Sequence, residues 1–244
     1  MPALAQVLDF LYPPRCTACG IALGAEAGRR VCARCVELVE RMPEPRCEVC
    51  GGALESATSD ASQCARCLAH PPRYRIARAI ARYRTTAEDE PGSLPALIRR
   101  HKYGLDQSVG RALVEYMGDE LPVSADDYDV VIPVPLHWRR LWWRGFNQAA
   151  LLGAEVANRL NLPLDTTAMS RRRFTTPQTS RHHDERIKNV RRAFAVTHPE
   201  RINNRRVLLV DDVMTTGATV DECARVLLAA GATRVDVFTL ARVL

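Results

Sequence analysis

Eight of the nine cysteines in this 244-residue chain form four Cys-x-x-Cys pairs. Such a turn presents two thiolates to one cation, and two turns complete a tetrahedral shell of four sulfurs. The pairs belong to a repeat of about 31 residues, in which Cys-Ala-Arg-Cys occurs at 32–35 and again at 64–67. We therefore predict two structural Zn²⁺ sites, one made by Cys16, Cys19, Cys32 and Cys35 and the other by Cys47, Cys50, Cys64 and Cys67.

Because the repeat copies whole units, it favours pairing the first motif with the second and the third with the fourth. An interleaved arrangement, first with third and second with fourth, stays open. Four copies in a repeat argue against a redox dithiol. Cys223 lies outside the repeat and is expected inside a helix.

A second candidate site follows an apolar run at Val207–Val210. Asp211 and Asp212 come directly after this run, and a turn rich in small residues then leads into a helix. The turn consists of Thr215, Thr216, Gly217, Ala218 and Thr219. Backbone N–H groups at a helix start suit a terminal phosphate, and paired carboxylates accept hydrogen bonds from vicinal hydroxyls. Together they indicate a ribose 5-phosphate, with a solvated acidic turn or an acidic metal pocket as the alternatives.

The charge of the chain is unevenly distributed. The formal net charge is +6, but residues 170–206 alone carry +8 and residues 1–70 carry −1. Two zinc ions, each bound by four thiolates, would move the N-terminal segment to about −5. A globally basic nucleic-acid binder is thus excluded, and an anionic ligand is expected near residues 170–206. Of the 34 basic residues 32 are Arg, which coding bias also explains.

The pattern of the remaining chain indicates how these residues are positioned. Strands are predicted at 76–83, 129–135, 206–210 and 235–240, and helices at 93–103, 107–121, 147–160 and 219–230. Alternating strands and helices predict an α/β domain with a mainly parallel sheet over residues 73–244, after a small zinc-binding module over residues 1–72. Without an apolar run long enough to span a membrane, or a secretory signal, we expect a cytoplasmic protein with reduced thiols and no membrane insertion.

The sequence resembles the type I phosphoribosyltransferases, whose fold is Rossmann-like, and among them the ComF family of competence and DNA-utilisation proteins, in which a double zinc ribbon precedes the phosphoribosyltransferase domain. The resemblance covers nearly the whole chain. Besides the cysteines and the Asp211–Thr219 segment, the residues that carry it are Lys102-Tyr103-Gly104, Pro133-Val134-Pro135-Leu136, Arg144-Gly145-Phe146-Asn147-Gln148-Ala149, Arg171-x-Arg173-x-Thr175-x-x-Gln178 and Arg186-x-x-Asn189.

The resemblance implies binding of phosphoribosyl pyrophosphate (PRPP). Asp211 and Asp212 would hold the ribose hydroxyls, and residues 215–219 the 5-phosphate. Mg²⁺ would bridge the pyrophosphate and the ribose hydroxyls. The resemblance further implies a pyrophosphate loop with Pro135, Leu136, Arg139, Arg140 and Arg144, a flap with Arg171, Thr175, Gln178, Arg186 and Asn189, and catalytic roles for Lys102 and Arg173.

The implied function is that of a phosphoribosyltransferase with an unspecified acceptor, acting in DNA uptake, natural transformation or DNA utilisation. The alternative is a non-catalytic module that senses PRPP or binds single-stranded DNA or partners such as a helicase or a DNA-processing protein of the competence machinery. Thr215 replaces an acid of purine-salvage relatives, which argues against their mechanism, and Arg181 replaces a usually apolar flap residue.

Two further groups of side chains are ambiguous in the sequence. His137, His182 and His183 have no metal-ligand partners at useful spacing, so solvated surface positions are expected. Trp138, Trp142 and Trp143 fit one side of a helix packed on the core, with base stacking or partner contact as the alternative.

Overall fold

The computed structural model describes residues 13–24, 28–54, 62–84, 91–103, 107–118, 121–174 and 188–243. The chain folds into two compact units, residues 1–40 with 84–119 and residues 41–83 with 120–244. Each unit therefore contains one of the two cysteine repeats. The sequence predicted a boundary between residues 72 and 73, where the zinc-binding module ends and the α/β domain begins, and this boundary stays a prediction.

The first unit combines the first cysteine repeat with a pair of helices. Helix α2 (Ala33–Glu37) begins directly after Cys32 and contains Cys35, so it carries the second Cys-x-x-Cys motif, and α4 (Leu94–Tyr103) packs against α5 (Gln107–Glu115). The carboxylate of Glu115 accepts hydrogen bonds from the backbone N–H groups of Arg30 (2.7 Å) and Val31 (2.9 Å). The end of α5 thus fixes the chain that leads into Cys32. The helix predicted at 107–121 ends earlier, at Glu115.

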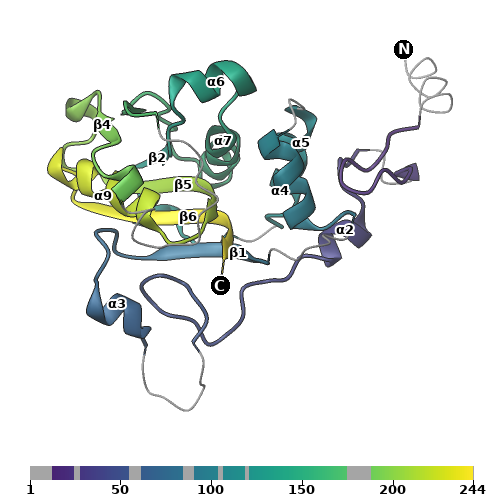
Figure 1. Cartoon of the computed structure of the whole chain (residues 1–244), viewed down its shortest axis with the longest axis horizontal. Helices are drawn as coiled ribbons and strands as arrows, with labels where there is room; N and C mark the ends of the chain where they lie inside the picture. Colours follow the sequence, from purple (N-terminus) through teal and green to yellow (C-terminus); the bar gives the residue numbers. More distant parts are fainter. Residues whose placement is uncertain are drawn as a thin grey trace. The chain divides into compact units, whose positions relative to one another are not determined.

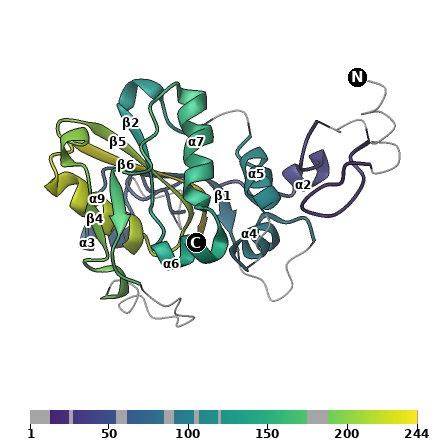
Figure 2. The same cartoon turned by 90° about the horizontal axis from the view of Figure 1, so that it is seen from above.

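The second unit is built on a four-stranded parallel sheet in the order β1-β6-β5-β2 (Figures 1 and 2). The strands are β1 (Ala77–Tyr83), β2 (Val130–Pro133), β5 (Arg206–Met214) and β6 (Arg234–Val243). This parallel α/β sheet confirms the fold class. β5 is longer than predicted, because its pairing with β6 continues through Asp211 and ends at Met214.

Helices cover both faces of this sheet. Gly153 of α7 (Gln148–Leu160) approaches Val131 and Pro133, whereas α9 (Ala218–Ala229) shares an apolar core with Val207 and Leu209. Because successive residues of a strand point to opposite faces and Val131 pairs with Leu208, the two helices lie on opposite sides. Both faces of β5 are therefore covered, as its run of apolar residues requires.

Smaller elements complete the second unit. They are helices α3 (Ala65–Ala69) and α6 (Trp138–Arg144), the 3₁₀ turns η2 (Ala125–Asp127) and η3 (Pro199–Arg201), and the antiparallel pair of β3 (Met169–Arg171) with β4 (Phe194–Val196). The β3–β4 pair brackets residues 175–187, which contain most of the predicted flap and lie outside the described residues.

The register of the sheet places two loops side by side. β2 ends at Pro133, which pairs with Val210, and the backbone N–H of Val134 donates to the Val210 carbonyl (2.8 Å). The turn after β2 therefore leaves the sheet next to Asp211. In a parallel sheet this carboxyl edge is where ligands bind. The fold thus brings the predicted pyrophosphate loop to the predicted ribose phosphate site.

Candidate functional site

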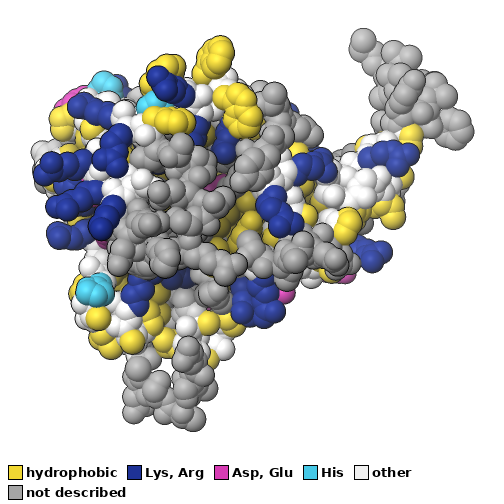
Figure 3. Space-filling model, viewed as in Figure 1, with side chains coloured by type: hydrophobic (Ala, Val, Ile, Leu, Met, Phe, Trp, Pro, Cys, Tyr) yellow, Lys and Arg dark blue, Asp and Glu magenta, His cyan; other side chains and the backbone are white. Residues whose placement is uncertain are grey.

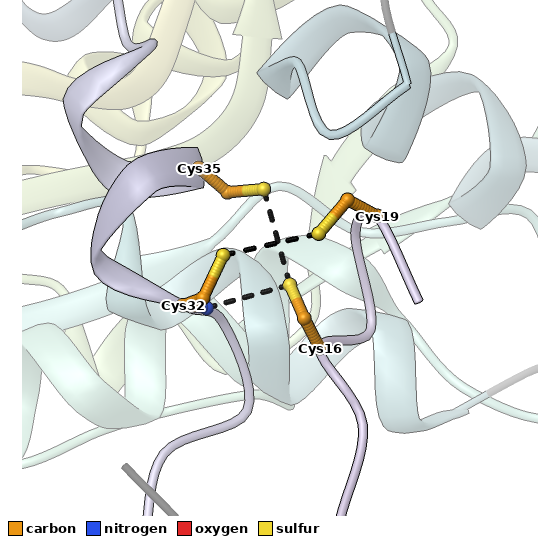
Figure 4. Close-up of side chains that lie close together, drawn as sticks. All are labelled: Cys16, Cys19, Cys32 and Cys35. Carbon is orange, nitrogen blue, oxygen red and sulfur yellow. Dashed lines mark hydrogen bonds between the residues drawn. The ribbon is translucent and has the colours of Figure 1, made fainter. Parts of the chain in front are cut away.

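The eight paired cysteines gather in two tetrads, Cys16, Cys19, Cys32 and Cys35 in the first unit and Cys47, Cys50, Cys64 and Cys67 in the second. Within each tetrad all four Sγ atoms lie within 4.8 Å of one another. Figure 4 shows the four thiols of the first tetrad pointing toward a common centre. Consecutive motifs therefore pair, as the repeat favours, and the interleaved arrangement does not form.

The geometry of both tetrads fits zinc. With Zn–S bonds of about 2.3 Å, the sulfurs of a tetrahedral site lie about 3.8 Å apart. The Sγ–Sγ distances are 3.9 Å for Cys16–Cys35, 3.8 Å for Cys19–Cys32 and 3.8 Å for Cys50–Cys64. With four thiolate ligands, each site would hold zinc as a closed structural centre.

The backbone also favours the thiolate form that zinc requires. The N–H of Cys32 points at Cys16 Sγ (3.4 Å), and the N–H groups of Cys50 (3.5 Å) and Cys64 (3.3 Å) point at Cys47 Sγ. Burial raises the pKa of Cys16 and Cys47, but these backbone donors outweigh it and bring each pKa down to about 7. One thiol of each tetrad is therefore ready to lose its proton near neutral pH.

The second tetrad is joined directly to the parallel sheet. The N–H of Ala77, the first residue of β1, donates to the carbonyl of Val49 between two of the ligands (2.7 Å). Gly51 has a φ of +66°, and a Cβ there would lie 2.6 Å from the Ala77 carbonyl oxygen. Only glycine satisfies both the backbone conformation and this close approach. The tetrad and the start of β1 are consequently one packed structure.

Arg242 connects the second tetrad to the end of β5. Its guanidinium donates to Cys50 Sγ (3.4 Å) and contacts the sulfur of Met214 (3.0 Å), and the side chain is 6% exposed. A buried guanidinium needs a negative partner, and a zinc ion with four thiolates carries about −2. Met214 is the last residue of β5 before the Thr-rich turn. Arg242 thus lies between the metal site and that turn.

The turn after β5 has the geometry of an anion site. Gly217 adopts a φ of +78°, and α9 begins at the next residue. A Cβ at Gly217 would lie 2.7 Å from Met214 Cε, so the glycine allows the turn to pack on β5. Asp211 and Asp212 are half-buried at the end of the strand, and Thr215 is exposed. The carboxylates of Asp211 and Asp212 therefore lie at the same edge of the parallel sheet as the N-terminus of α9, a helix of twelve residues.

Arg66 holds the same turn from the second cysteine repeat, because its guanidinium donates to the carbonyl oxygen of Thr216. Arg66 lies between Cys64 and Cys67, in the repeated Cys-Ala-Arg-Cys. The sequence did not single out Arg66 or Arg242 as functional. The repeated Cys-Ala-Arg-Cys motif could have drawn attention to Arg66. No local sequence pattern distinguishes Arg242, which lies in the last strand.

Cations of α6 and β3 lie near one another, because the backbone of Arg171 pairs with that of His137, the residue before α6. Burial lowers the pKa of Arg140, and the positive charges of Arg171 and Arg144 lower it further. Burial also lowers the pKa of Arg171, an effect that the negative charge of Asp211 opposes. The start of the predicted flap therefore lies beside the predicted pyrophosphate loop, and β2, which leads into that loop, pairs with β5 directly before Asp211.

Other predicted residues are placed differently. Pro135 is buried and Leu136 half-buried in the turn before α6, and the Arg139 guanidinium lies over the rings of Trp138 (5.3 Å) and Phe174 (5.7 Å). Arg173 donates to the Asn189 carbonyl (3.1 Å) and so closes the base of the flap. Lys102 is in α4 of the first unit, and its side chain lies outside the described residues, as do Thr175, Gln178 and Arg186.

The expectations for His137 and the tryptophans are wrong. His137 is 4% exposed, because it caps α6 through Nδ1 and packs edge-on against Phe174. Burial lowers its pKa, and the neighbouring arginines add to this effect. The tryptophans do share a short helix but do not pack on the core, and Trp142 is 86% exposed. Figure 3 shows large hydrophobic side chains protruding over α6.

The two tetrads lead to a stoichiometric prediction. Elemental analysis of the purified protein should give two zinc ions per chain. Cys35→Ser and Cys67→Ser, which occupy equivalent positions of the repeat, should each reduce this to one, because each removes a ligand from one closed site. The combined variant should contain none. A single substitution that emptied both sites would contradict two independent centres.

Comparisons with known proteins agree with this architecture. Residues 7–68 match the double zinc ribbon domain, and residues 147–244 match the phosphoribosyl transferase domain. The DNA utilization protein YhgH of Shigella flexneri is 34% identical over 92% of this chain and 94% of that protein. Competence protein F of Haemophilus influenzae is 31% identical over 87% of this chain and 90% of that protein.

A solved structure, glutamine phosphoribosylpyrophosphate amidotransferase from B. subtilis, is 20% identical with a TM-score of 0.35, over 64% of this chain and 29% of that one. Among the residues that the structure describes, no helix is long and apolar enough to cross a membrane.

The cysteine tetrads, the parallel α/β fold and identity above 30% over most of the chain show that this protein belongs to the ComF family, with a double zinc ribbon and a phosphoribosyltransferase domain.

Proposed function

We propose that this protein binds PRPP together with Mg²⁺ at the carboxyl edge of its parallel sheet. The observation that carries the proposal is that the loop between β2 and the arginine-rich helix α6 leaves the sheet beside Asp211, pairs with β3 at Arg171, and adjoins the strand whose following turn opens α9. A diol, a monophosphate and a pyrophosphate are the three groups of PRPP, and these side chains offer a partner for each. Zinc at the tetrads would serve structure alone.

Each group of PRPP has a partner suited to its chemistry. The carboxylates of Asp211 and Asp212 accept hydrogen bonds from the ribose 2′- and 3′-hydroxyls. The N–H groups at the start of α9 hold the 5-phosphate, which the positive end of the helix dipole favours. The positive charges of Arg171 and Arg144 act on Arg140, so a pyrophosphate bound among these guanidinium groups would gain charge-assisted hydrogen bonds. Mg²⁺ would arrive with the pyrophosphate oxygens.

If the protein turns PRPP over, the reaction is a displacement at C1 of the ribose. The bond from C1 to the pyrophosphate oxygen breaks, and an acceptor nucleophile forms the new bond to C1. The negative charge that develops on the leaving group would be stabilised by the arginines, which are already positioned before the reaction. Thr215 provides no acid–base group for a purine, so an acceptor other than a purine base is favoured.

The cellular role that we propose follows the named relatives. Because they are DNA utilization and competence proteins, this chain would act in the uptake or use of DNA, through an acceptor derived from nucleic acid or as an accessory protein. Thiol-only zinc sites need reduced cysteines, which suits the cytoplasm.

PRPP with Mg²⁺ should stabilise the folded protein. At about 100 times its Kd, a ligand that binds only the native state adds about 2.7 kcal/mol, which corresponds to a rise in Tm of roughly 5–10 °C at this chain length. The double variant Asp211→Asn/Asp212→Asn should lose this rise, whereas Glu155→Gln/Glu200→Gln, which removes two charges elsewhere in the same unit, should keep it. Differential scanning calorimetry measures both. A wild-type Tm that does not respond to millimolar PRPP would overturn the proposal.

A second function is favoured by the surface of α6. Trp138, Trp142 and Trp143 are exposed next to Arg139 and Arg140, and the Arg139 guanidinium stacks on Trp138. Exposed aromatic rings among arginines form the stacking surface used for single-stranded nucleic acid. We infer that α6 binds single-stranded DNA weakly and without sequence preference, consistent with the DNA-related names of the relatives.

Fluorescence anisotropy with a labelled oligonucleotide tests this surface. Trp142→Ala should weaken binding by about 1–3 kcal/mol, because one stacked base is lost. Leu68→Ala, which removes another exposed apolar side chain (64%) of the same unit, should have no effect. The affinity should also fall with rising salt, by about 0.7 log units per tenfold salt for each phosphate contact. Equal loss in both variants, or binding that ignores salt, would contradict a stacking surface on α6.

A further inference from the structure

A cavity of about 820 Å³ lies beside the first turn of α9 in the second unit. Thr216, Gly217 and Ala218 line it, together with His70, Pro71, Pro72 and Tyr74. Asp211 and Asp212 are absent from its described walls. The cavity therefore adjoins the phosphate end of the proposed PRPP site and not its ribose or pyrophosphate end. Its volume is in the range typical of pockets for small molecules, about 300–1,000 Å³.

The charged side chains of the cavity favour an anion. Four arginines line it, together with two acids, Asp221 and Glu222. The acids already have partners, because Asp221 accepts the N–H of Arg73 (2.5 Å) and Glu222 forms an ion pair with Arg225 (2.8 Å). Arg66, Arg191 and Arg192 supply the remaining positive charge. In Figure 3 basic side chains gather over β4 and α9.

The loop that carries two of these arginines is fixed in place. Arg192 has a φ of +56°, an unfavourable backbone conformation for a residue with a side chain. Its N–H donates to the carboxylate of the buried Glu222 (2.7 Å), which holds the loop against α9. The positions of Arg191 and Arg192 beside the cavity therefore follow from a specific contact of α9.

We propose that this cavity binds the second phosphate of a ligand whose ribose 5-phosphate carries a further phosphate in anhydride linkage, that is, a ribosyl 5-diphosphate. The inference rests on the proposed function, because the α9 N-terminus must hold the first phosphate. Here the turn that would hold this phosphate opens into a cavity lined by arginines, whose guanidinium groups suit phosphate oxygens.

Isothermal titration calorimetry with two matched probes tests the proposal. Ribose 5-phosphate carries the first phosphate alone, and ADP-ribose carries the same ribosyl phosphate joined through an anhydride bond to the phosphate of a nucleoside monophosphate. We expect ADP-ribose to bind about tenfold more tightly or better, since the added phosphate gains charge-assisted hydrogen bonds. Asp211→Asn/Asp212→Asn should weaken both probes, because both place the same ribose at the end of β5.

Variants of the cavity separate this inference from the proposed function. Arg191→Ala/Arg192→Ala should remove the advantage of ADP-ribose and leave ribose 5-phosphate binding within about twofold. Arg159→Ala/Arg205→Ala removes the same charge from outside the cavity and should keep the advantage. If ribose 5-phosphate binds but ADP-ribose binds no better, or if the advantage survives without Arg191 and Arg192, the inference is wrong while the proposed function stands. If neither probe binds the wild type, the inference is wrong, and the response of the Tm to PRPP decides the proposed function separately.

Discussion

Arg242 lies near the end of the last strand, and its guanidinium is buried. Its contacts join the second cysteine tetrad to the parallel sheet of the second unit. On one side it donates to Cys50 of the second tetrad, and on the other it contacts Met214, where β5 ends. A buried cation of this kind is stable only beside a compensating negative charge. Four thiolates around zinc supply that charge, whereas four protonated thiols do not. The metal site and the end of β5 therefore stabilise each other.

The two zinc ribbons therefore differ in their relation to the candidate site. The second ribbon contributes to the site, because Arg66 between its ligands holds the carbonyl of Thr216, and because the backbone next to Cys50 pairs with the start of β1. The first tetrad is surrounded by other residues, among them Gly92, where a Cβ would lie 2.7 Å from Cys35 Sγ. Although the two repeats share one sequence pattern, they are packed into different structures. Their metals are accordingly expected to have different consequences for ligand binding.

The sequence predicted the parts of the structure that are encoded locally. Four Cys-x-x-Cys motifs predict two tetrads because ligand geometry depends on short spacing, and the apolar run before Asp211 predicts a buried strand. Contacts between segments distant in the sequence could not be predicted from it. Arg242 lies 192 residues from Cys50, so no local pattern reveals its partner. The sequence indicated a surface position for His137, whereas the structure buries it between the start of α6 and Phe174. The periodicity of Trp138, Trp142 and Trp143 indicated a helix, but which face meets the core depends on tertiary packing.

Hydrogen exchange at the turn after β5 tests the coupling between metal and turn most directly. Cys67→Ser and Cys35→Ser remove equivalent ligands of the two repeats, and amide exchange is followed by mass spectrometry in peptides that cover residues 214–219. We expect Cys67→Ser to increase exchange there at least about tenfold, because loss of the second metal frees Arg66 and Arg242, and Cys35→Ser to leave it unchanged. Unchanged protection in Cys67→Ser after loss of its zinc, or equal effects of the two variants, would contradict the account.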